Sequence, residues 1–358
     1  MEPTGASRLT EWLELGHHGE MGYLQDRKEA YANPGSVLEG ARTLVMLMLD
    51  YHTLEPAPAK AERGRVARYA WGAVDYHDLI HGKLEHLKRE LERRHPEAAV
   101  RGVVDTAPLL EREYAQLAGL GWQGKNTLLL SPGRGSYFFL ACLLTSLDLP
   151  LDTPATTDHC GTCTACLDAC PTSAFVGPNL MDARKCISYL TIELKGQIPS
   201  ELRPKMGNWL FGCDVCQEVC PWNRFAAPTD EPGFAPRESG GELDAAELLM
   251  LDEDTFRARF RRTPLWRPKR RGILRNAAIV LGNSTAQLSG RAADALIAGL
   301  RDGEPLVRGA CAWAMGRHLD DQLILVLRNR LTVEADADVR QEIEAALIRE
   351  ADQTIDPR

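Results

Sequence analysis

Eight of the ten cysteines lie between Cys160 and Cys220, and this density limits the chemistry of the chain more than any other feature. Disulfide frameworks are typical of small secreted domains. Residues 1–13, however, lack the basic region and apolar core of a secretory signal. Dense cysteine in an intracellular chain indicates metal binding, so we expect a cytoplasmic protein whose cysteines hold metal.

The cysteines form two runs, and each run ends at a proline. Residues 160–171 have the spacing C-x2-C-x2-C-x3-C-P of bacterial ferredoxins, in which the fourth cysteine ligates the other cluster of a pair. Residues 213–221 have the spacing C-x2-C-x3-C-P, and Cys186 stands upstream of them. Three thiolates on a tight loop can hold three corners of an iron–sulfur cube, so the fourth corner must come from elsewhere.

Eight thiolates are a complete ligand set for two [4Fe–4S] clusters. We assign the first cluster to Cys160, Cys163, Cys166 and Cys220, and the second to Cys170, Cys186, Cys213 and Cys216. Structural zinc also takes four thiolates, but the x2-x2-x3-Pro spacing differs from that of common zinc modules. Cys142 and Cys311 have apolar neighbours in sequence and are expected to be inert core residues.

Residues 1–152 are predicted to form an α/β domain. Strand-like segments at 41–50, 100–104, 127–130 and 136–145 alternate with helical patterns at 75–94 and 109–117. This alternation predicts a sheet of at least four strands. The longest apolar runs are far shorter than the ~20 residues that cross a bilayer, so no membrane association is expected.

The rest of the chain divides into two further predicted domains. Residues 153–228 would form a two-cluster ferredoxin-like domain, and residues 226–241, rich in proline, glycine and acidic residues, resemble a linker. The motifs that begin at Leu274, Val307 and Val339 recur at intervals of 33 and 32 residues. Such a period is typical of α-solenoids, so residues 229–358 are predicted to be a linker and HEAT-like helical repeats, with an ordinary helical bundle as the alternative.

The net charge of −8 argues against a chain that binds nucleic acid over its whole surface. Between Arg257 and Arg275, however, nine basic residues occur with no acidic one, and Phe260 and Trp266 are interleaved. This local concentration favours contact with phosphate groups. The alternative is a solvated basic face that pairs with the acidic residues at 252–254.

Three further motifs resemble those of a known family. They are R-Y-A-W-G-A-V-D-Y-H at 68–77, V-D-T-A-P-L-L-E-R at 104–112 and A-G-L-G-W-Q-G-K-N at 118–126. With the cysteine runs and the helical repeats, they are similar to epoxyqueuosine reductases, which are cobalamin-dependent iron–sulfur enzymes of tRNA modification. The resemblance spans about residues 10–350. The chain departs from it at 30–34, where A-Y-A-N-P replaces a segment that usually contains arginine, and upstream of Arg8, where members usually have another strand and helix, so a late start at Met1 is expected.

The resemblance implies a reaction and its cofactors. The α/β domain would bind cobalamin, with its cobalt between the substrate pocket and the nearer cluster. A low-potential donor, which the sequence does not identify, would supply two electrons singly through the clusters. The enzyme would then remove the epoxide oxygen of epoxyqueuosine at the anticodon wobble position of tRNA, leaving queuosine and water, as the last step of queuosine biosynthesis.

The resemblance also implies roles for individual residues. Asp105 would donate a proton to the departing oxygen, for which burial beside the corrin would have to raise its pKa; the alternative is that Asp105 or Thr106 caps a helix. The histidines at 77, 81 and 86 are interpreted as surface residues. Segments expected near the corrin contain Tyr69, Lys125, Asn126, Ser188, Tyr189, Asp214 and Val215. Expected tRNA contacts are Arg262, Arg267, Lys269, Arg270 and Arg271.

Two other functions fit parts of the pattern. Reductive dehalogenases join cobalamin to two similar clusters, but they are typically exported and lack a helical-repeat tail. A plain electron-transfer protein would use the α/β and repeat domains as docking surfaces. Bound corrin in the purified protein would exclude the second of these alternatives.

Overall fold

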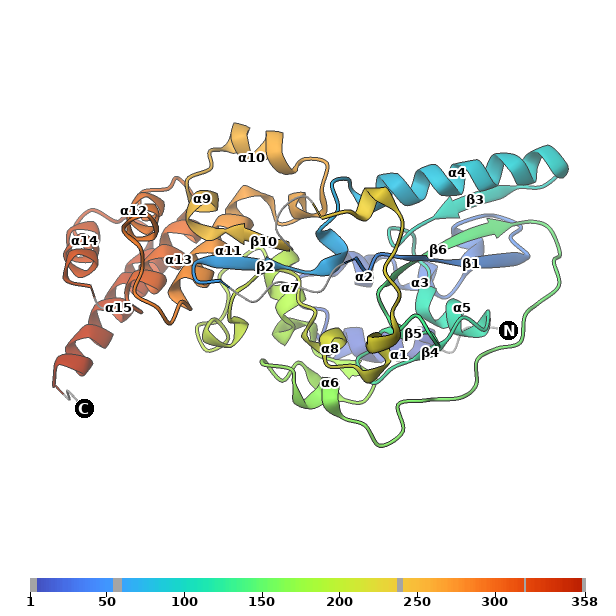
Figure 1. Ribbon diagram of the computed structural model, residues 1–358, viewed down its shortest axis with the longest axis horizontal. Helices are drawn as coiled ribbons and strands as arrows, with labels where there is room; N and C mark the ends of the chain where they lie inside the picture. Colours follow the sequence, from blue (N-terminus) through green and yellow to red (C-terminus); the bar gives the residue numbers. More distant parts are fainter. Residues whose placement is uncertain (1–4, 54–59, 237–240, 319, 356–358) are drawn as a thin grey trace. The chain divides into compact units, whose positions relative to one another are not determined.

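The computed structural model describes residues 5–53, 60–236, 241–318 and 320–355 (Figure 1). The chain forms two compact units, each assembled from separate segments. The first comprises residues 1–54, 71–186 and 214–236, and the second comprises residues 55–70, 187–213 and 237–358. The segment 153–228 thus contributes to both units, and the three predicted domain boundaries stay predictions.

The first unit is built on a three-stranded antiparallel sheet in the order β1-β6-β3. Its strands are β1 (Thr43–Asp50), β6 (Phe138–Thr145) and β3 (Val100–Val103), and β6 is antiparallel to both neighbours. The expectation of at least four strands in this sheet is wrong for the described residues. The segment predicted at 127–130 contributes β5 (Leu129–Leu130), which pairs with β4 (Trp122–Gln123) in a separate hairpin. A tight turn, in which the Thr127 N–H donates to the Gly124 carbonyl at 2.8 Å, folds β5 back onto β4.

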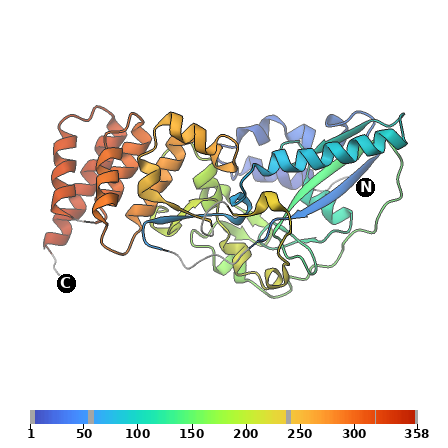
Figure 2. The ribbon, with the colours of Figure 1, turned by 45° about the horizontal axis from the view of Figure 1, so that its top comes forward.

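The helix predicted at 75–94 is confirmed as α4 (Tyr76–Arg94). Asp75 is its N-cap, and the Asp75 carboxylate accepts the backbone N–H of His77. Ile80 and Leu84 lie on its buried face, and α4 packs along β3 and β6 (Figure 2). The short helix α5 (Glu111–Leu117) follows β3 after a loop. This loop, residues 104–110, carries Asp105 and is called the 104–110 loop below.

The other helices of the first unit are short. They are α1 (Gly5–Glu14), α2 (Gly22–Asp26), α3 (Lys28–Tyr31), α6 (Ala165–Asp168) and α8 (Val215–Glu218), and a hairpin is formed by β7 (Phe175–Gly177) and β8 (Leu180–Met181). Helix α6 lies in the first cysteine run, α8 lies in the second, and the two helices contact each other. The folding of this unit therefore brings the two runs together.

The predicted linker is packed rather than extended as far as Pro236. Phe234 is buried, with its ring centroid 5.4 Å from that of Phe139, and Pro236 forms a β-bridge with Gly72. An aromatic side chain and a backbone bridge anchor this proline-rich segment to the first unit, which its composition did not indicate. Residues 237–240 of the predicted linker lie outside the described residues.

The second unit combines a small sheet with helices. The sheet has the order β10-β2-β9, formed by β10 (Glu242–Asp244), β2 (Arg63–Val66) and β9 (Trp209–Phe211). The helices are α7 (Ile187–Ile192), α9 (Ala245–Leu249), α10 (Glu253–Phe260), α11 (Lys269–Gly282), α12 (Gly290–Gly299), α13 (Pro305–Met315), α14 (Asp321–Leu331) and α15 (Ala337–Ile355). No helix among the described residues is long and apolar enough to span a bilayer.

The three repeated motifs lie in α11, α13 and α15, and each of these helices packs on the next (Figure 2). The glycines that follow two of the motifs make this packing close. A Cβ atom at Gly282 would approach Ala314 Cα to 2.9 Å, and one at Gly316 would approach Ala346 Cα to 2.8 Å. The alternating helices agree with a repeat architecture, and the HEAT-like class stays a prediction.

Candidate active site and cysteine centres

Asp105 lies at the carboxyl end of β3, at the start of the 104–110 loop. Its φ of +37° is in the left-handed region, which is strained for a residue with a Cβ and costs about 1–3 kcal/mol. Two side chains hold this backbone. Glu111 Oε1 accepts the Asp105 N–H at 2.8 Å, and Arg27 Nη1 donates to the Thr106 carbonyl at 3.1 Å.

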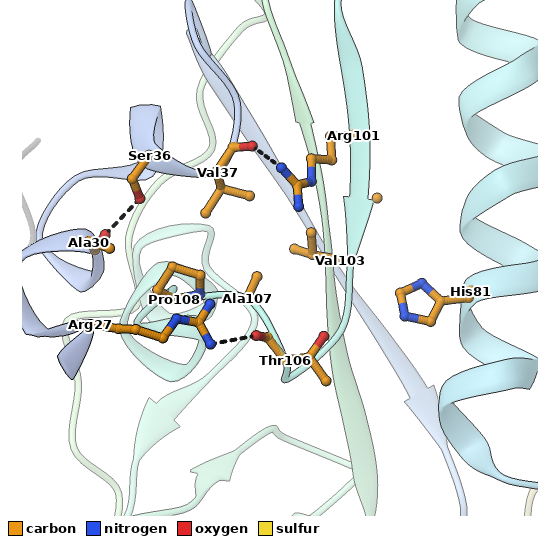
Figure 3. Close-up of a pocket in the computed structure, with 11 residues that line it drawn as sticks. Arg27, Ala30, Ser36, Val37, His81, Arg101, Val103, Thr106, Ala107 and Pro108 are labelled. Carbon is orange, nitrogen blue, oxygen red and sulfur yellow. Dashed lines mark hydrogen bonds between the residues drawn. The ribbon is translucent and has the colours of Figure 1, made fainter. Parts of the chain in front are cut away.

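A cavity of about 390 Å³ lies beside this loop (Figure 3). Arg27 and Thr106 line it, joined by their hydrogen bond, and Arg101 and Val103 of β3 line it as well. The loop therefore borders the cavity on one side, while Ala107 and Leu109 anchor it in the hydrophobic core. Backbone strain beside a cavity is what a loop that changes conformation would show.

Both carboxylate oxygens of Asp105 have partners on the first turn of α4. His77 Nε2 lies 2.8 Å from Asp105 Oδ1, and the Tyr76 hydroxyl donates to Asp105 Oδ2. His77 Nδ1 lies 2.6 Å from Asp75 Oδ1, so the imidazole bridges two carboxylates. The interpretation of His77 as a surface residue holds only in part, because its side chain is 29 % exposed but is hydrogen-bonded to Asp105. The D-Y-H end of the 68–77 motif was the available signal, because it contains both of these partners of Asp105 and Asp75, the second partner of His77.

The charges in this cluster shift the pKa values of its members. Burial alone would lower the pKa of His77, but the hydrogen bonds and negative charges of Asp105 and Asp75 outweigh burial and raise it to about 9. Burial favours a higher pKa for Asp105, but the hydrogen bond and charge of His77 outweigh this effect, so the pKa lies below its ordinary value. The raised pKa that a proton-donating Asp105 requires is therefore not present in the protein alone. At neutral pH the proton resides on His77.

Glu111 completes the cluster. Burial, and then the charge of Asp105, raises its pKa to about 7. Its protonation therefore changes close to neutral pH, next to the backbone of the residue it holds. The side chain of Asp105 is itself 43 % exposed, so its carboxyl group is open to a bound molecule.

None of the seven cysteines of the two runs, nor Cys186 between them, forms a disulfide bond. Burial raises the pKa of Cys166, and the next contributions come from Cys220, Cys160 and Cys163, its partners in the first assigned set. Burial likewise raises the pKa of Cys216, with further contributions from Cys186, Asp214, Cys166 and Cys170, so that Cys216 interacts with cysteines of both sets. Seven of the eight cysteines lie in the first unit, and their assignment to two clusters stays a prediction. Cys213 belongs to the second unit.

The thiols are not gathered around a single point. Among the described residues, no group of three or more Cys, His, Asp or Glu side chains is arranged to hold one metal ion. A tetrahedral zinc site needs four ligands about 2.3 Å from one centre, whereas a cube spreads its thiolates over four corners. The buried indole N–H of Trp122 has no described partner, and its ring lies 4.8 Å from His159 and 4.9 Å from Trp222. These rings adjoin Cys160 and Cys220 in sequence, so an acceptor such as cluster sulfide fits this donor.

The residues expected at the corrin divide between the two units. Asp105, Lys125, Asn126, Asp214 and Val215 belong to the first, and Tyr69, Ser188 and Tyr189 belong to the second. Lys125 Nζ donates to the carbonyls of Gly161 at 2.6 Å and Cys163 at 2.9 Å. Asn126 Nδ2 donates to the Cys216 carbonyl at 3.3 Å. Lys125 and Asn126 thus hold the cysteine loops, and one of the three ammonium protons of Lys125 remains for a further acceptor, which fits a ligand with amide groups.

The basic segment of the second unit contains arginines of different kinds. Arg270 is half-buried, donates to the Leu251 carbonyl at 2.7 Å and pairs with Asp302. Arg267 pairs with Glu193 at 3.0 Å but stays exposed. Lys269 Nζ lies 4.2 Å above the Trp266 ring. Arg262 and Arg271 are exposed. Four of the five expected tRNA contacts are therefore accessible, while Arg270 is committed to a contact within the protein.

Comparison with known proteins defines first a class and then a family. Residues 159–223 match the model of a 4Fe-4S double cluster binding domain, so the chain carries an iron–sulfur domain of this class. Residues 32–106 match the model described as epoxyqueuosine reductase QueG, DUF1730. An epoxyqueuosine reductase from Pseudomonas aeruginosa is 45 % identical over 318 residues, which cover 87 % of this chain and 87 % of the relative. The chain belongs to the epoxyqueuosine reductase family and is an oxidoreductase.

Solved structures of the family have the same fold. An epoxyqueuosine reductase in complex with a tRNA-Tyr epoxyqueuosine-modified stem loop has a TM-score of 0.88 at 33 % identity, covering 97 % of this chain and 91 % of that one. A Bacillus subtilis epoxyqueuosine reductase, solved with its aspartate-bearing catalytic loop swung out of the active site, has a TM-score of 0.87 at 33 % identity, covering 96 % and 91 %.

Proposed function

We propose that this chain reduces the epoxide of epoxyqueuosine at the wobble position of tRNA to the alkene of queuosine, in the last step of queuosine biosynthesis. The observation that carries this proposal is the likeness, over 97 % of the chain, to the reductase that was solved with an epoxyqueuosine-modified stem loop. The cofactors would be two [4Fe–4S] clusters and cobalamin, with electrons from a low-potential donor.

The proposed ligand sets are supported by the grouping of the thiols. Cys160, Cys163, Cys166 and Cys220 would hold one cluster, and Cys170, Cys186, Cys213 and Cys216 the other. Cobalamin would be held by Tyr69, Lys125, Asn126, Ser188, Tyr189, Asp214 and Val215, with Asp105 beside it. Bound there, cobalamin would supply a strong two-electron nucleophile for opening the epoxide.

The chain's own residues would orient the substrate and supply protons. Asp105 has the role of proton donor, because its carboxyl group is open to a bound molecule and its loop is held by Glu111 and Arg27. General acid catalysis prevents the departing oxygen from leaving as an unstable alkoxide.

The exposed cations of the basic segment would contact tRNA phosphates. These cations are Arg262, Arg267, Lys269 and Arg271, and Arg270 would support the helix beneath them.

The experiment is anaerobic purification, analysis of iron, sulfide and cobalamin, and turnover on epoxyqueuosine-containing tRNA with dithionite as the electron donor. We expect about eight iron and eight sulfide per chain, bound or bindable cobalamin, and queuosine as the product. Zinc without inorganic sulfide would contradict the cluster assignment. Full metal and corrin loading without queuosine formation would contradict the proposed substrate.

A further inference from the structure

Both ring nitrogens of His77 contact a carboxylate, although a hydrogen bond to Asp105 would need only one of them. Its Nε2 lies 2.8 Å from Asp105 Oδ1, while its Nδ1 lies 2.6 Å from Asp75 Oδ1. Asp75 is fixed because it also accepts the His77 backbone N–H at 3.0 Å as the N-cap of α4. A doubly protonated ring satisfies both carboxylates at once, since each nitrogen then donates.

Aromatic rings keep the His77 imidazole in place. The Tyr76 ring stacks on that of His77 with centroids 4.0 Å apart, and Phe139 of β6 stacks on the other side of Tyr76 at 4.2 Å. Glu111 on α5 is the other titratable group whose charge interacts with His77. The groups that face His77 are therefore two aspartates, one tyrosine and one glutamate. The side chain of His77 is 29 % exposed, so the ring can exchange protons with solvent.

The proposed reaction needs more protons than one carboxyl group holds. Converting an epoxide to an alkene and water breaks two C–O bonds and consumes two electrons and two protons. The electrons come from the low-potential donor, but both protons must reach the same oxygen atom. Asp105 presents one carboxyl group with one titratable proton, so it must be reprotonated within a single turnover.

We propose that His77 is a positioning residue that stores a proton and reloads Asp105, so that both protons of the reaction pass through the Asp75–His77–Asp105 chain. This inference rests on the proposed function. In the first transfer, the Nε2 proton moves to Asp105 Oδ1 and the carboxyl group protonates the epoxide oxygen. The imidazole, neutral and still bonded through Nδ1–H to Asp75, takes a proton from solvent at Nε2. It then reloads Asp105, which protonates the hydroxyl oxygen and releases it as water.

The first test measures the proton store directly and needs no turnover. NMR of the holoenzyme labelled with 15N-histidine would follow the ring nitrogens of His77 as pH rises. We expect the imidazolium to persist well above neutral pH, with a midpoint near the value of about 9 that its surroundings give. Asp75→Asn, which removes one charge and keeps the shape, should lower this midpoint by about one pH unit or more. A midpoint near the ordinary value of 6.5 in the wild-type protein would overturn the proposal.

The second test is the pH profile of kcat, with dithionite and epoxyqueuosine-containing tRNA at saturation. The wild-type rate should stay high until the His77 proton is lost at alkaline pH. In His77→Gln, which hydrogen-bonds without titrating, kcat at pH 8 should fall about 100-fold. The falling limb should also move to lower pH by about two units or more, because Asp105 then titrates alone. The tRNA Kd should not change. His86→Gln, an exposed histidine of the same helix, is the matched control.

The outcomes separate this inference from the proposed function. Wild-type protein without queuosine formation contradicts the proposed function, and the NMR titration still decides whether His77 stores the proton. If the wild type turns over and the His77→Gln profile is lower but parallel to it, His77 is only structural and the proposal fails. If His77→Gln does not load iron, Asp75→Asn takes its place, and an unshifted limb in that variant overturns the proposal equally.

Discussion

Two charged regions of the molecule, the cluster around Asp105 and the basic segment at 257–275, use their charges in opposite ways. Around Asp105, His77 bridges two carboxylates at 2.6 and 2.8 Å, and the shared charges shift the pKa values of His77 and Asp105. In the basic segment, arginines lie in different environments: Arg275 is fully buried, Arg270 pairs with Asp302, and Arg271 is exposed. Coupled charges can therefore do proton chemistry, while isolated exposed charges can only attract a partner of opposite sign.

The sharpest test of the coupled region is Asp105→Asn. The amide keeps the size of the side chain but has no acidic proton, so turnover should fall by about 10²–10⁴ while tRNA binding is unchanged. Removing the charge should also lower the pKa of His77. Single-turnover kinetics and tRNA titration measure these effects, with Asp78→Asn, an exposed aspartate of α4, as the control. Full turnover in Asp105→Asn would remove it as the proton donor.

Within the basic segment, the largest effect is expected at Arg275. Its guanidinium donates to the carbonyls of Leu190 at 2.7 Å, Leu194 at 2.8 Å and Gly196 at 2.6 Å. Arg275→Met would leave these acceptors without donors, which should lower the free energy of unfolding by about 3–5 kcal/mol. Urea denaturation measures the loss, and Arg271→Met is the matched control, expected to stay within about 0.5 kcal/mol. Equal losses of stability in the two variants would show that the buried Arg275 contributes no more to folding than the exposed Arg271.

Glu111→Gln tests whether the raised pKa of Glu111 makes the free energy of unfolding depend on pH. Because folding raises the pKa of Glu111 from 4.5 to about 7, its contribution is fully present below pH 4.5 and is lost as pH rises through 7. Glutamine stays neutral and still accepts the Asp105 N–H. The variant should match the wild type near pH 4.5 and exceed its free energy of unfolding by about 3 kcal/mol at pH 8, since each unit of pKa shift corresponds to about 1.4 kcal/mol. A difference that does not vary with pH, seen in denaturation at both values, would show that folding does not raise the pKa of Glu111.

The smallest effect is expected at the isolated exposed charges. Arg271→Ala should weaken tRNA binding a few-fold and reduce the salt dependence of log K by about one unit, as the loss of one phosphate contact predicts. Filter binding at several salt concentrations measures both quantities. Arg270→Ala should instead lower stability, because it removes the ion-pair partner of the half-buried Asp302. An unchanged salt slope in Arg271→Ala would exclude this position from the tRNA interface.

The elements that the sequence predicted well are those set by local pattern. Apolar residues every three or four positions sufficed for α4, and short continuous apolar runs sufficed for β1 and β6. The number of strands in the sheet was wrong because Leu129 and Leu130 suit either a central strand or a hairpin, and a turn at Gly124 settles the choice. His77 was missed because its helical spacing is that of an exposed position, while its partner Asp105 is distant in sequence.

The amino-acid order sufficed to identify the cysteine chemistry, because cluster ligation depends on short spacings within one loop and on a proline-flanked cysteine after it. It also sufficed to mark Asp105, which lies in a motif of contiguous residues. Folding was needed to show where the proton resides and which arginines are accessible. The pKa of a side chain and its exposure depend on burial and on charges brought from remote segments, and those distances do not exist until the chain is folded.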